Sequence, residues 1–121
     1  MNLEQVNKLS DKEINYKMME VCGFSKIEPI DWGVEDSSLI GIHDYRGWND
    51  KIGWDLIPIY TENLNACHEL WINLTYLEQV YYMDNLGLVI CGPNKNDWLW
   101  CDIVNSTAIQ RCKAYILTMT E

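Results

Sequence analysis

Hydrophobic residues recur at helical spacing in three stretches of this chain, and the pattern predicts helices over residues 11–22, 61–75 and 106–118. Each stretch places an apolar stripe along one face: Ile14, Met18, Val21 and Cys22; Leu64, Cys67, Trp71 and Leu74; and Ala108, Cys112, Ile116 and Met119. Because an apolar stripe has to be covered, we expect each helix to pack against another element.

Capping residues stand where these helices are expected to begin. Ser10 and Glu13 match a capping box, in which each side chain accepts a hydrogen bond from the other residue's backbone N–H. Thr61 is the expected N-cap of the second helix, and Asn105 or Ser106 that of the third.

Three shorter stretches in the C-terminal half, residues 80–83, 88–91 and 98–104, predict antiparallel strands joined by short turns. The last stretch is apolar on both faces, since Leu99, Cys101 and Ile103 alternate with Trp98, Trp100 and Asp102. A strand that is apolar on both faces needs helices on both sides of its sheet. The sequence therefore predicts an α+β fold for a single domain over residues 1–121. Its form is a three-layer α-β-α sandwich, with three helices and an antiparallel sheet of three or four strands.

The segment from Phe24 to Trp54 follows neither period, and Pro29 and several glycines interrupt it. A short strand over residues 38–43 is the one regular element expected there. Long irregular segments in compact domains are commonly functional. This segment is therefore the first place to look for a binding surface.

The chain is acidic, because its 18 acidic residues outnumber its 9 basic residues and leave a net charge of −9. Residues 28–55 carry seven acids against Arg46 and Lys51. Such a balance disfavours direct contact with nucleic acid and favours a basic protein surface as partner. The aromatic residues comprise six Trp and seven Tyr against one Phe, and Trp and Tyr are enriched at interfaces.

The five cysteines are odd in number and include no C-x-x-C pair. The first residues do not form an apolar signal, and no apolar run approaches the length of a membrane span. We therefore expect a cytoplasmic protein with no membrane contact, in which reduced thiols pack as small apolar groups.

Few residues offer catalytic or metal-binding chemistry. His43 and His68 are the only histidines, and although Cys91, Cys101 and His68 add up to three zinc ligands, no pair has zinc-finger spacing. Phosphate-binding loops, dinucleotide fingerprints and nucleophile elbows are absent from the sequence. We expect neither an enzyme nor a bound metal or cofactor.

Acidic side chains in the middle segment leave one alternative open. Asp31, Glu35, Asp36 and Asp44 could pair for acid–base work or for a Mg²⁺ site. A solvated acidic loop is the more common structure for such a cluster, and it is the interpretation we adopt.

Three patches of the sequence resemble the phage ABA-sandwich domain family. Residues 11–24, Asp-Lys-Glu-Ile-Asn-Tyr-Lys-Met-Met-Glu-Val-Cys-Gly-Phe, are similar to its opening helix, residues 59–70 to its second helix and residues 107–117 to its closing helix. Phe24 stands where the family favours Trp, and the middle of this chain is more acidic and richer in Trp. The resemblance implies an α-β-α sandwich encoded by a phage or prophage. The family has no catalytic residues to transfer.

Charge, size and resemblance together predict a non-enzymatic accessory protein that binds and inhibits a host factor. An anti-CRISPR or other anti-defence inhibitor is the expected class, and its partner would be a basic host protein such as a nucleic-acid-binding defence effector. The predicted contact residues are Trp32 and Trp48 as anchors and Glu35, Asp36, Asp44 and Asp50 as steering charges. The alternative is a small-ligand or nucleotide sponge, and homodimerisation is left open.

Overall fold

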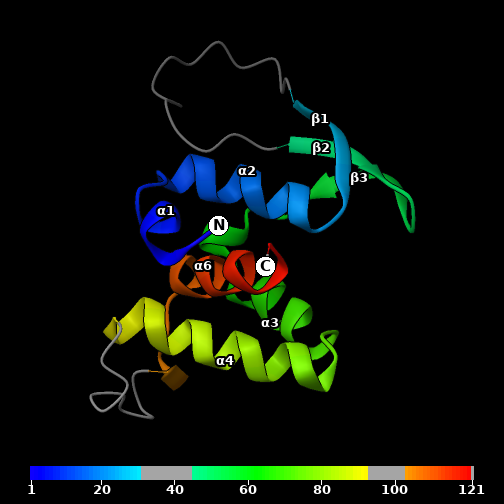
Figure 1. The fold of residues 1–121 in the computed structure, drawn as a ribbon. Coiled ribbons are helices and arrows are strands. Elements are labelled where there is room, and N and C mark those ends of the chain that lie inside the picture. Colours follow the sequence, from blue (N-terminus) through cyan, green and yellow to red (C-terminus); the bar gives the residue numbers. More distant parts are fainter. Residues whose placement is uncertain (31–44, 93–102, 121) are drawn as a thin grey trace.

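A computed structural model of the chain describes residues 1–30, 45–92 and 103–120 (Figure 1). Its helices are α1 (Leu3–Asn7), α2 (Asp11–Val21), α3 (Leu64–Ile72), α4 (Tyr76–Cys91) and α6 (Ala108–Met119), with a 3₁₀ turn η1 (Tyr60–Glu62) before α3. The strands are β1 (Phe24–Pro29), β2 (Tyr45–Asn49) and β3 (Gly53–Ile57).

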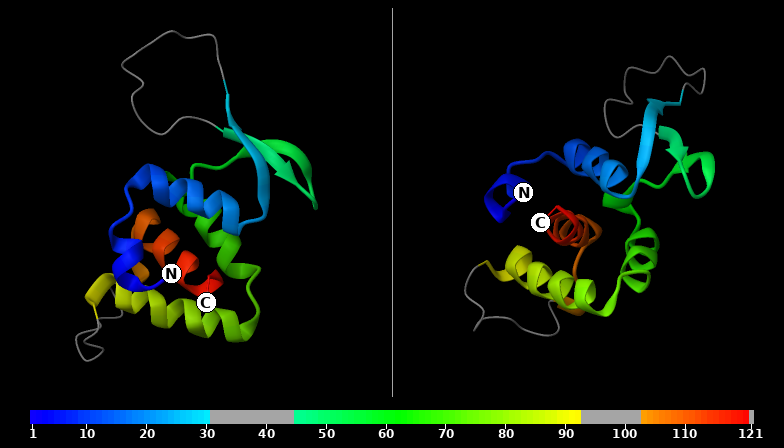
Figure 2. Two further views of the ribbon diagram at one scale, coloured as in Figure 1. Left: turned by 45° about the horizontal axis from the view of Figure 1, so that its top comes forward. Right: turned by 45° about the vertical axis from the view of Figure 1, so that its right-hand side comes forward.

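The C-terminal helix α6 lies at the centre of the helical body. Figure 2 shows it between α2 on one side and α4 on the other, and it also contacts α1, α3 and η1. Its side chains are buried around most of its circumference, with Cys112, Ala114 and Ile116 fully inaccessible. A helix with buried side chains on so many sides is stable only when other elements enclose it, which fits its central position.

The three strands form one antiparallel sheet in the order β1-β2-β3, beside the helical body rather than inside it (Figure 1). It meets the helices through β1, which contacts α2. Gly47 has to be small, because a Cβ there would lie 3.0 Å from Ile57 Cδ1 and 3.1 Å from the Ser25 carbonyl oxygen. Gly53 closes the β2–β3 hairpin with a φ of +77°, which favours glycine.

The α+β class and the antiparallel sheet are confirmed, but the strands come from other residues than predicted. The sheet forms from residues 24–57, which the sequence predicted to be largely irregular. The strand pairing joins residues that are far apart along the chain, such as Pro29 and Tyr45. The three-layer sandwich is not confirmed, and residues 38–43 lie outside the described residues.

The predicted strands at 80–83 and 88–91 and the turn between them are wrong, because α4 runs through all of them. The side chain of Thr75 accepts from Glu78 N at 3.3 Å, and Glu78 Oε1 accepts from Thr75 N at 2.9 Å, so a capping box starts this helix. Tyr82 and Leu86, four residues apart, then turn to the core. Of the third predicted strand, residues 98–102 lie outside the described residues, while Ile103 and Val104 are helical.

The helix predicted over 11–22 is confirmed together with its capping box, in which Ser10 Oγ accepts from Glu13 N at 3.2 Å. The other two predicted helices form with different starts. Asn63 caps α3, while Thr61 is buried within η1. Thr107 caps α6 in place of Asn105 or Ser106.

None of the described helices combines the length and the apolar character that crossing a membrane requires.

Candidate functional site

The predicted contact residues fall in two groups. Trp32, Glu35, Asp36 and Asp44 lie outside the described residues. Trp48 and Asp50 are described, and the structure brings them together, because Trp48 Nε1 donates a hydrogen bond to Asp50 Oδ1 at 2.9 Å. Asp50 therefore holds the indole of Trp48 in place within the hairpin.

Trp48 contributes to a cluster on the outer face of the sheet. Its ring meets Trp54 edge to face, with centroids 6.1 Å apart. The Arg46 guanidinium lies 5.7 Å from the Trp54 ring centroid and forms a salt bridge with Glu28. Trp48 is half-buried, whereas Trp54 is 51% exposed. Trp54 is thus the more accessible indole of the two, and it lies opposite Trp48 in the β2–β3 register.

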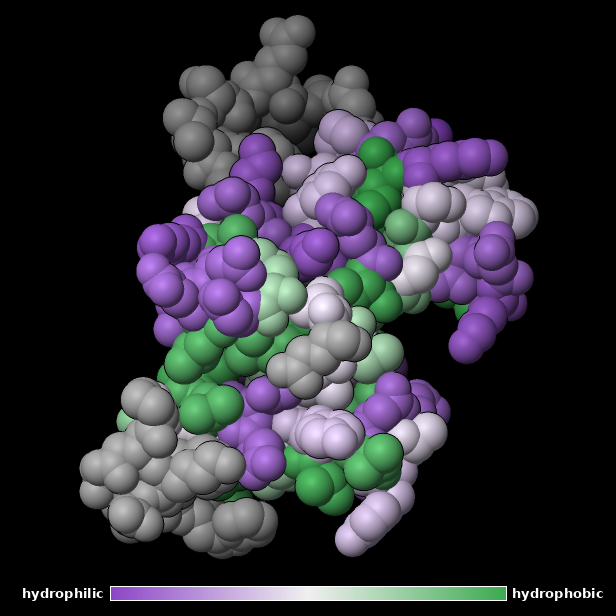
Figure 3. All heavy atoms as spheres, in the orientation of Figure 1, coloured by the Kyte–Doolittle hydropathy of each residue, from purple (hydrophilic) through white to green (hydrophobic). Residues whose placement is uncertain are grey.

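A larger apolar surface lies on the first half of α4. We call it the α4 face, and it consists of Tyr76, Leu77, Val80 and Tyr81. Tyr76 is 83% and Leu77 60% exposed, and the four positions adjoin one another at helical spacings of three and four residues. Figure 3 shows green, apolar side chains over this part of α4, at the lower right of the view.

The segment of the chain that contains the α4 face is acidic. Residues 52–94 contain no Lys or Arg, while the acids there are Asp55, Glu62, Glu69, Glu78 and Asp84. Asp84 is exposed one helical turn beyond Val80. Lys51 lies near Glu78, since both line one pocket at the surface. The α4 face therefore combines exposed apolar side chains with acids on its own helix, and the sequence analysis missed it because it assigned these residues partly to a strand.

Two cysteines meet in the core. Cys67 Sγ and Cys112 Sγ lie 3.8 Å apart between α3 and α6, and both residues are buried. The hydrogen bond with Cys67, together with burial, raises the pKa of the Cys112 thiol above its usual range. Burial likewise raises the pKa of Cys22 to about 11. These two thiols are protonated at neutral pH, and a protonated thiol is a poor nucleophile.

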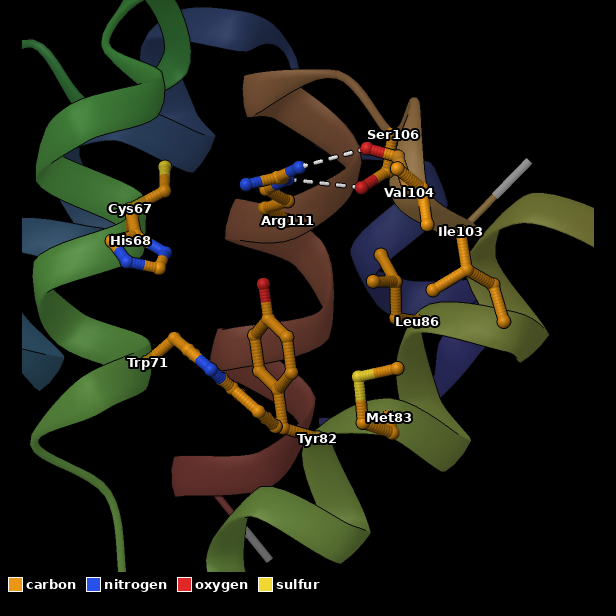
Figure 4. Close-up of a pocket in the computed structure, with 10 residues that line it drawn as sticks. All are labelled: Cys67, His68, Trp71, Tyr82, Met83, Leu86, Ile103, Val104, Ser106 and Arg111. Atoms are coloured by element: carbon orange, nitrogen blue, oxygen red, sulfur yellow. Dashed lines mark hydrogen bonds between the residues drawn. The ribbon is translucent and has the colours of Figure 1, made fainter. Parts of the chain in front are cut away.

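A pocket of about 200 Å³ opens between α3, α4 and α6 (Figure 4). It is lined by Cys67, His68, Trp71, Tyr82, Met83, Leu86, Ile103, Val104, Ser106 and Arg111. Three separate helices and the segment before α6 supply these side chains, so no local sequence pattern joins them.

The polar end of the pocket is built around Arg111. Its Nε donates to Ser106 Oγ at 2.9 Å and its Nη2 to the Val104 carbonyl oxygen at 3.3 Å. Ser106 is only 3% exposed, so the guanidinium is anchored to the interior of the fold. The lining contains no Asp or Glu, and Arg111 forms no salt bridge within the described part of the chain.

The other end of the pocket is aromatic and apolar. The rings of Trp71 and Tyr82 lie 5.2 Å apart at 47°, and Met83, Leu86 and Ile103 form the adjoining wall (Figure 4). Burial raises the pKa of the Tyr82 hydroxyl well above its usual range, so that this group remains a neutral donor.

Metal-binding groups do not gather in the described ranges: no three His, Cys, Asp or Glu residues there lie close enough together to hold an ion. Of the zinc ligands considered from the sequence, Cys91 ends α4 and His68 lines the pocket, while Cys101 lies outside the described residues. His43 lies outside them as well.

Comparisons of this chain with protein-family models, with curated proteins and with solved structures find no match. The resemblance to phage ABA-sandwich domains therefore stays a prediction. Function has to be inferred from the side chains that the chain itself presents.

Proposed function

We propose that this chain is a non-enzymatic binding protein that inhibits a host partner by covering a basic surface of that partner, with the α4 face as its main contact. The observation that carries the proposal is the α4 face itself: four adjoining large side chains are exposed on a helix that has two acids and no Lys or Arg.

Exposed apolar side chains are unremarkable when scattered, but contiguous ones rimmed by polar residues mark interaction sites. Tyr76 and Tyr81 suit such a role, because Tyr gives a large contact area at low cost in side-chain entropy. An anchor of this kind, flanked by Glu78 and Asp84 on the same helix, fits a partner surface with an apolar centre and basic residues beside it.

A second copy of the chain would fit the α4 face less well than a basic partner would. Face-to-face pairing through α4 would bring Glu78 and Asp84 of both copies together, and α4 itself holds no Lys or Arg to neutralise them. Like charges opposed across an interface are costly, whereas Lys and Arg of a partner gain from the same field. The acids of this helix and the net charge of −9 also speak against direct contact with nucleic acid.

The inhibitory role follows from the kind of surface that such an anchor covers. Basic surfaces with apolar centres occur where proteins hold nucleic acid, and an acidic protein seated there excludes that ligand. An accessory protein of a phage, directed at a nucleic-acid-binding defence effector, is the class of inhibitor that this proposal includes.

The test uses a defined probe, a fluorescent helical peptide with Leu and Phe along one face and Lys and Arg beside it. A second peptide of the same composition has its sequence scrambled, so that charge is kept and the apolar face is lost. We expect fluorescence anisotropy to detect binding of the first peptide only, weakening as salt rises because the charges are exposed.

Two variants locate the contact. Leu77→Ser should weaken peptide binding about tenfold, as removal of a central apolar anchor does. Leu56→Ser is the matched control, since Leu56 is 54% exposed on the sheet against 60% for Leu77, and it should leave binding unchanged. Equal binding of the scrambled peptide, or an equal effect of Leu56→Ser, would refute the proposal. Sedimentation that finds a dimer dissociated by Leu77→Ser would do so too.

A further inference from the structure

The pocket between α3, α4 and α6 has features that partner binding through the α4 face does not use. We propose that this pocket binds a small aromatic carboxylate, a molecule with one ring and one carboxylate group. The proposal is independent of the proposed function, because it concerns the interior side of α4 rather than its exposed face.

Arg111 determines the charge of the ligand. A guanidinium has five N–H donors, and hydrogen bonds to Ser106 and Val104 use two of them. The remaining donors meet no carboxylate among the described residues, although the chain has 18 acidic residues. Their planar arrangement matches the two oxygens of a carboxylate. The anchoring through buried Ser106 holds the guanidinium in position before a ligand arrives.

The aromatic end of the pocket determines which uncharged group the ligand carries beside its carboxylate. The tilted pair of Trp71 and Tyr82 provides aromatic surface, and Leu86 closes the apolar side. In Figure 4 the Tyr82 hydroxyl points from this ring toward Arg111. A carboxylate bound to Arg111 therefore lies within reach of a second, neutral donor, while the ring attached to it contacts apolar side chains.

The size of the pocket suits a small ligand. Its volume of about 200 Å³ is below the roughly 300–1,000 Å³ of pockets that hold drug-sized molecules. A nucleotide is larger than this space, so the pocket gives no support to the nucleotide-sponge alternative. Inorganic phosphate would leave the apolar wall unused, and among the described residues Arg111 is the only Lys or Arg that lines the pocket.

The test compares carboxylates with uncharged alcohols of the same carbon skeleton. Benzoate and phenylacetate are titrated into the full chain against benzyl alcohol and 2-phenylethanol, with binding followed by calorimetry and by two-dimensional NMR of the indole N–H groups. We expect low-millimolar or tighter binding of the carboxylates, weaker binding of the alcohols, and shifts of the Trp71 signal without shifts of Trp48 and Trp54. Equal binding of the alcohols, shifts confined to the sheet, or no binding of any probe would overturn the proposal.

Arg111→Gln should lower carboxylate affinity about tenfold or more, because a charge-assisted pair is lost. The matched control is Arg46→Gln, which removes the same charge from the sheet and should leave affinity unchanged. Since Arg111 also ties α6 to the preceding turn, its variant could fail to fold. Tyr82→Phe, which keeps the ring, then decides: it should weaken carboxylate binding and leave alcohol binding unchanged. Unaltered carboxylate affinity in Tyr82→Phe would overturn the proposed placement.

Discussion

At the scale of single residues, reciprocal capping recurs along this chain. The helices α1, α2, α4 and α6 each begin with a capping box, formed by Asn2 and Gln5, Ser10 and Glu13, Thr75 and Glu78, and Thr107 and Gln110. In each box two backbone N–H groups at the helix start gain acceptors. Two of the boxes use a carboxylate and two use an amide, so charged and neutral capping side chains can be compared within one protein.

The carboxylate boxes predict a pH dependence of stability. Hydrogen bonds from the backbone and side chain of Ser10 lower the pKa of Glu13, and those from Thr75 lower the pKa of Glu78. When the pKa of a carboxyl group is lower in the folded state than in the unfolded state, the ionised carboxylate stabilises the fold. This stability is fully present above the unfolded-state pKa and is lost as pH falls through the folded-state pKa. We expect wild type to exceed the Glu13→Gln/Glu78→Gln variant in stability at pH 7 and to converge with it in acid. Urea titrations across pH measure this, and a constant difference at all pH values would contradict it.

The buried thiols predict an order of chemical reactivity. Cys112 is fully inaccessible and Cys67 is 4% exposed, so both should resist iodoacetamide in the native protein at pH 8 and react once urea is added. Cys22 should react slowly and accelerate as pH approaches its pKa of about 11. Peptide mapping by mass spectrometry identifies each site. Rapid native labelling of Cys67 would show that the α3–α6 contact opens easily.

At the scale of elements, α4 shows how a cap and a buried stripe decide between helix and strand. The segment contains β-branched and aromatic residues, which favour strands locally. Its Thr75 box sets the helical start, and Tyr82 and Leu86 then face the core one turn apart. Asn85 Nδ2 also donates to Thr118 Oγ1 at 3.1 Å, which joins α4 to α6. Tertiary packing thus reinforces what the cap begins.

Removal of this cap should therefore weaken the fold. Thr75→Ala leaves the Glu78 N–H without its acceptor and is expected to cost about 1 kcal/mol, within the range of roughly 0.5–2 kcal/mol for N-cap removal. Thr75→Ser keeps the hydroxyl and serves as the control. The midpoint of urea denaturation measures both. A midpoint for Thr75→Ala that equals wild type would mean that packing alone determines where α4 begins.

At the scale of the whole molecule, one helix connects the parts. α6 contacts α1, α2, α3, α4 and η1, while the sheet stands to the side. The N-terminus also contacts the end of α6, since the N-terminal amine donates to Thr120 Oγ1 at 3.1 Å. A substitution that disturbs the packing of α6 should therefore destabilise all the helices that contact it, whereas a substitution at the tip of the hairpin should act only locally.

A pair of matched isoleucine variants tests this arrangement. Ile116 in α6 is fully buried, so Ile116→Ala should cost about 2–5 kcal/mol, as large-to-small changes in cores do. Ile52 in the β2–β3 turn is 59% exposed, and Ile52→Ala should change stability by no more than about 0.5 kcal/mol. Thermal and chemical denaturation give both values. Similar losses for the two variants would contradict the central role of α6.

The sequence by itself determined the features that depend on neighbours along the chain. The helix at Asp11–Val21 followed from its capping box and apolar stripe, and the acidic character of residues 52–94 is a matter of composition. The start of α4 was also present in the sequence as Thr75 and Glu78, a signal outweighed by the apolar run after it. Local signals of this kind act within a few residues, and they can be read without a fold.

Only the tertiary structure decided which distant residues meet. β1 and β2 pair across the gap from Pro29 to Tyr45, and no periodicity links two strands so far apart. Cys67, Tyr82 and Arg111 line one pocket from three helices, although each has ordinary neighbours in the sequence. Which side of α4 faces α6, and which side is left exposed, depends on how the helices pack. The pocket and the α4 face are therefore properties of the packing, which is determined by the whole core and not by any one segment of it.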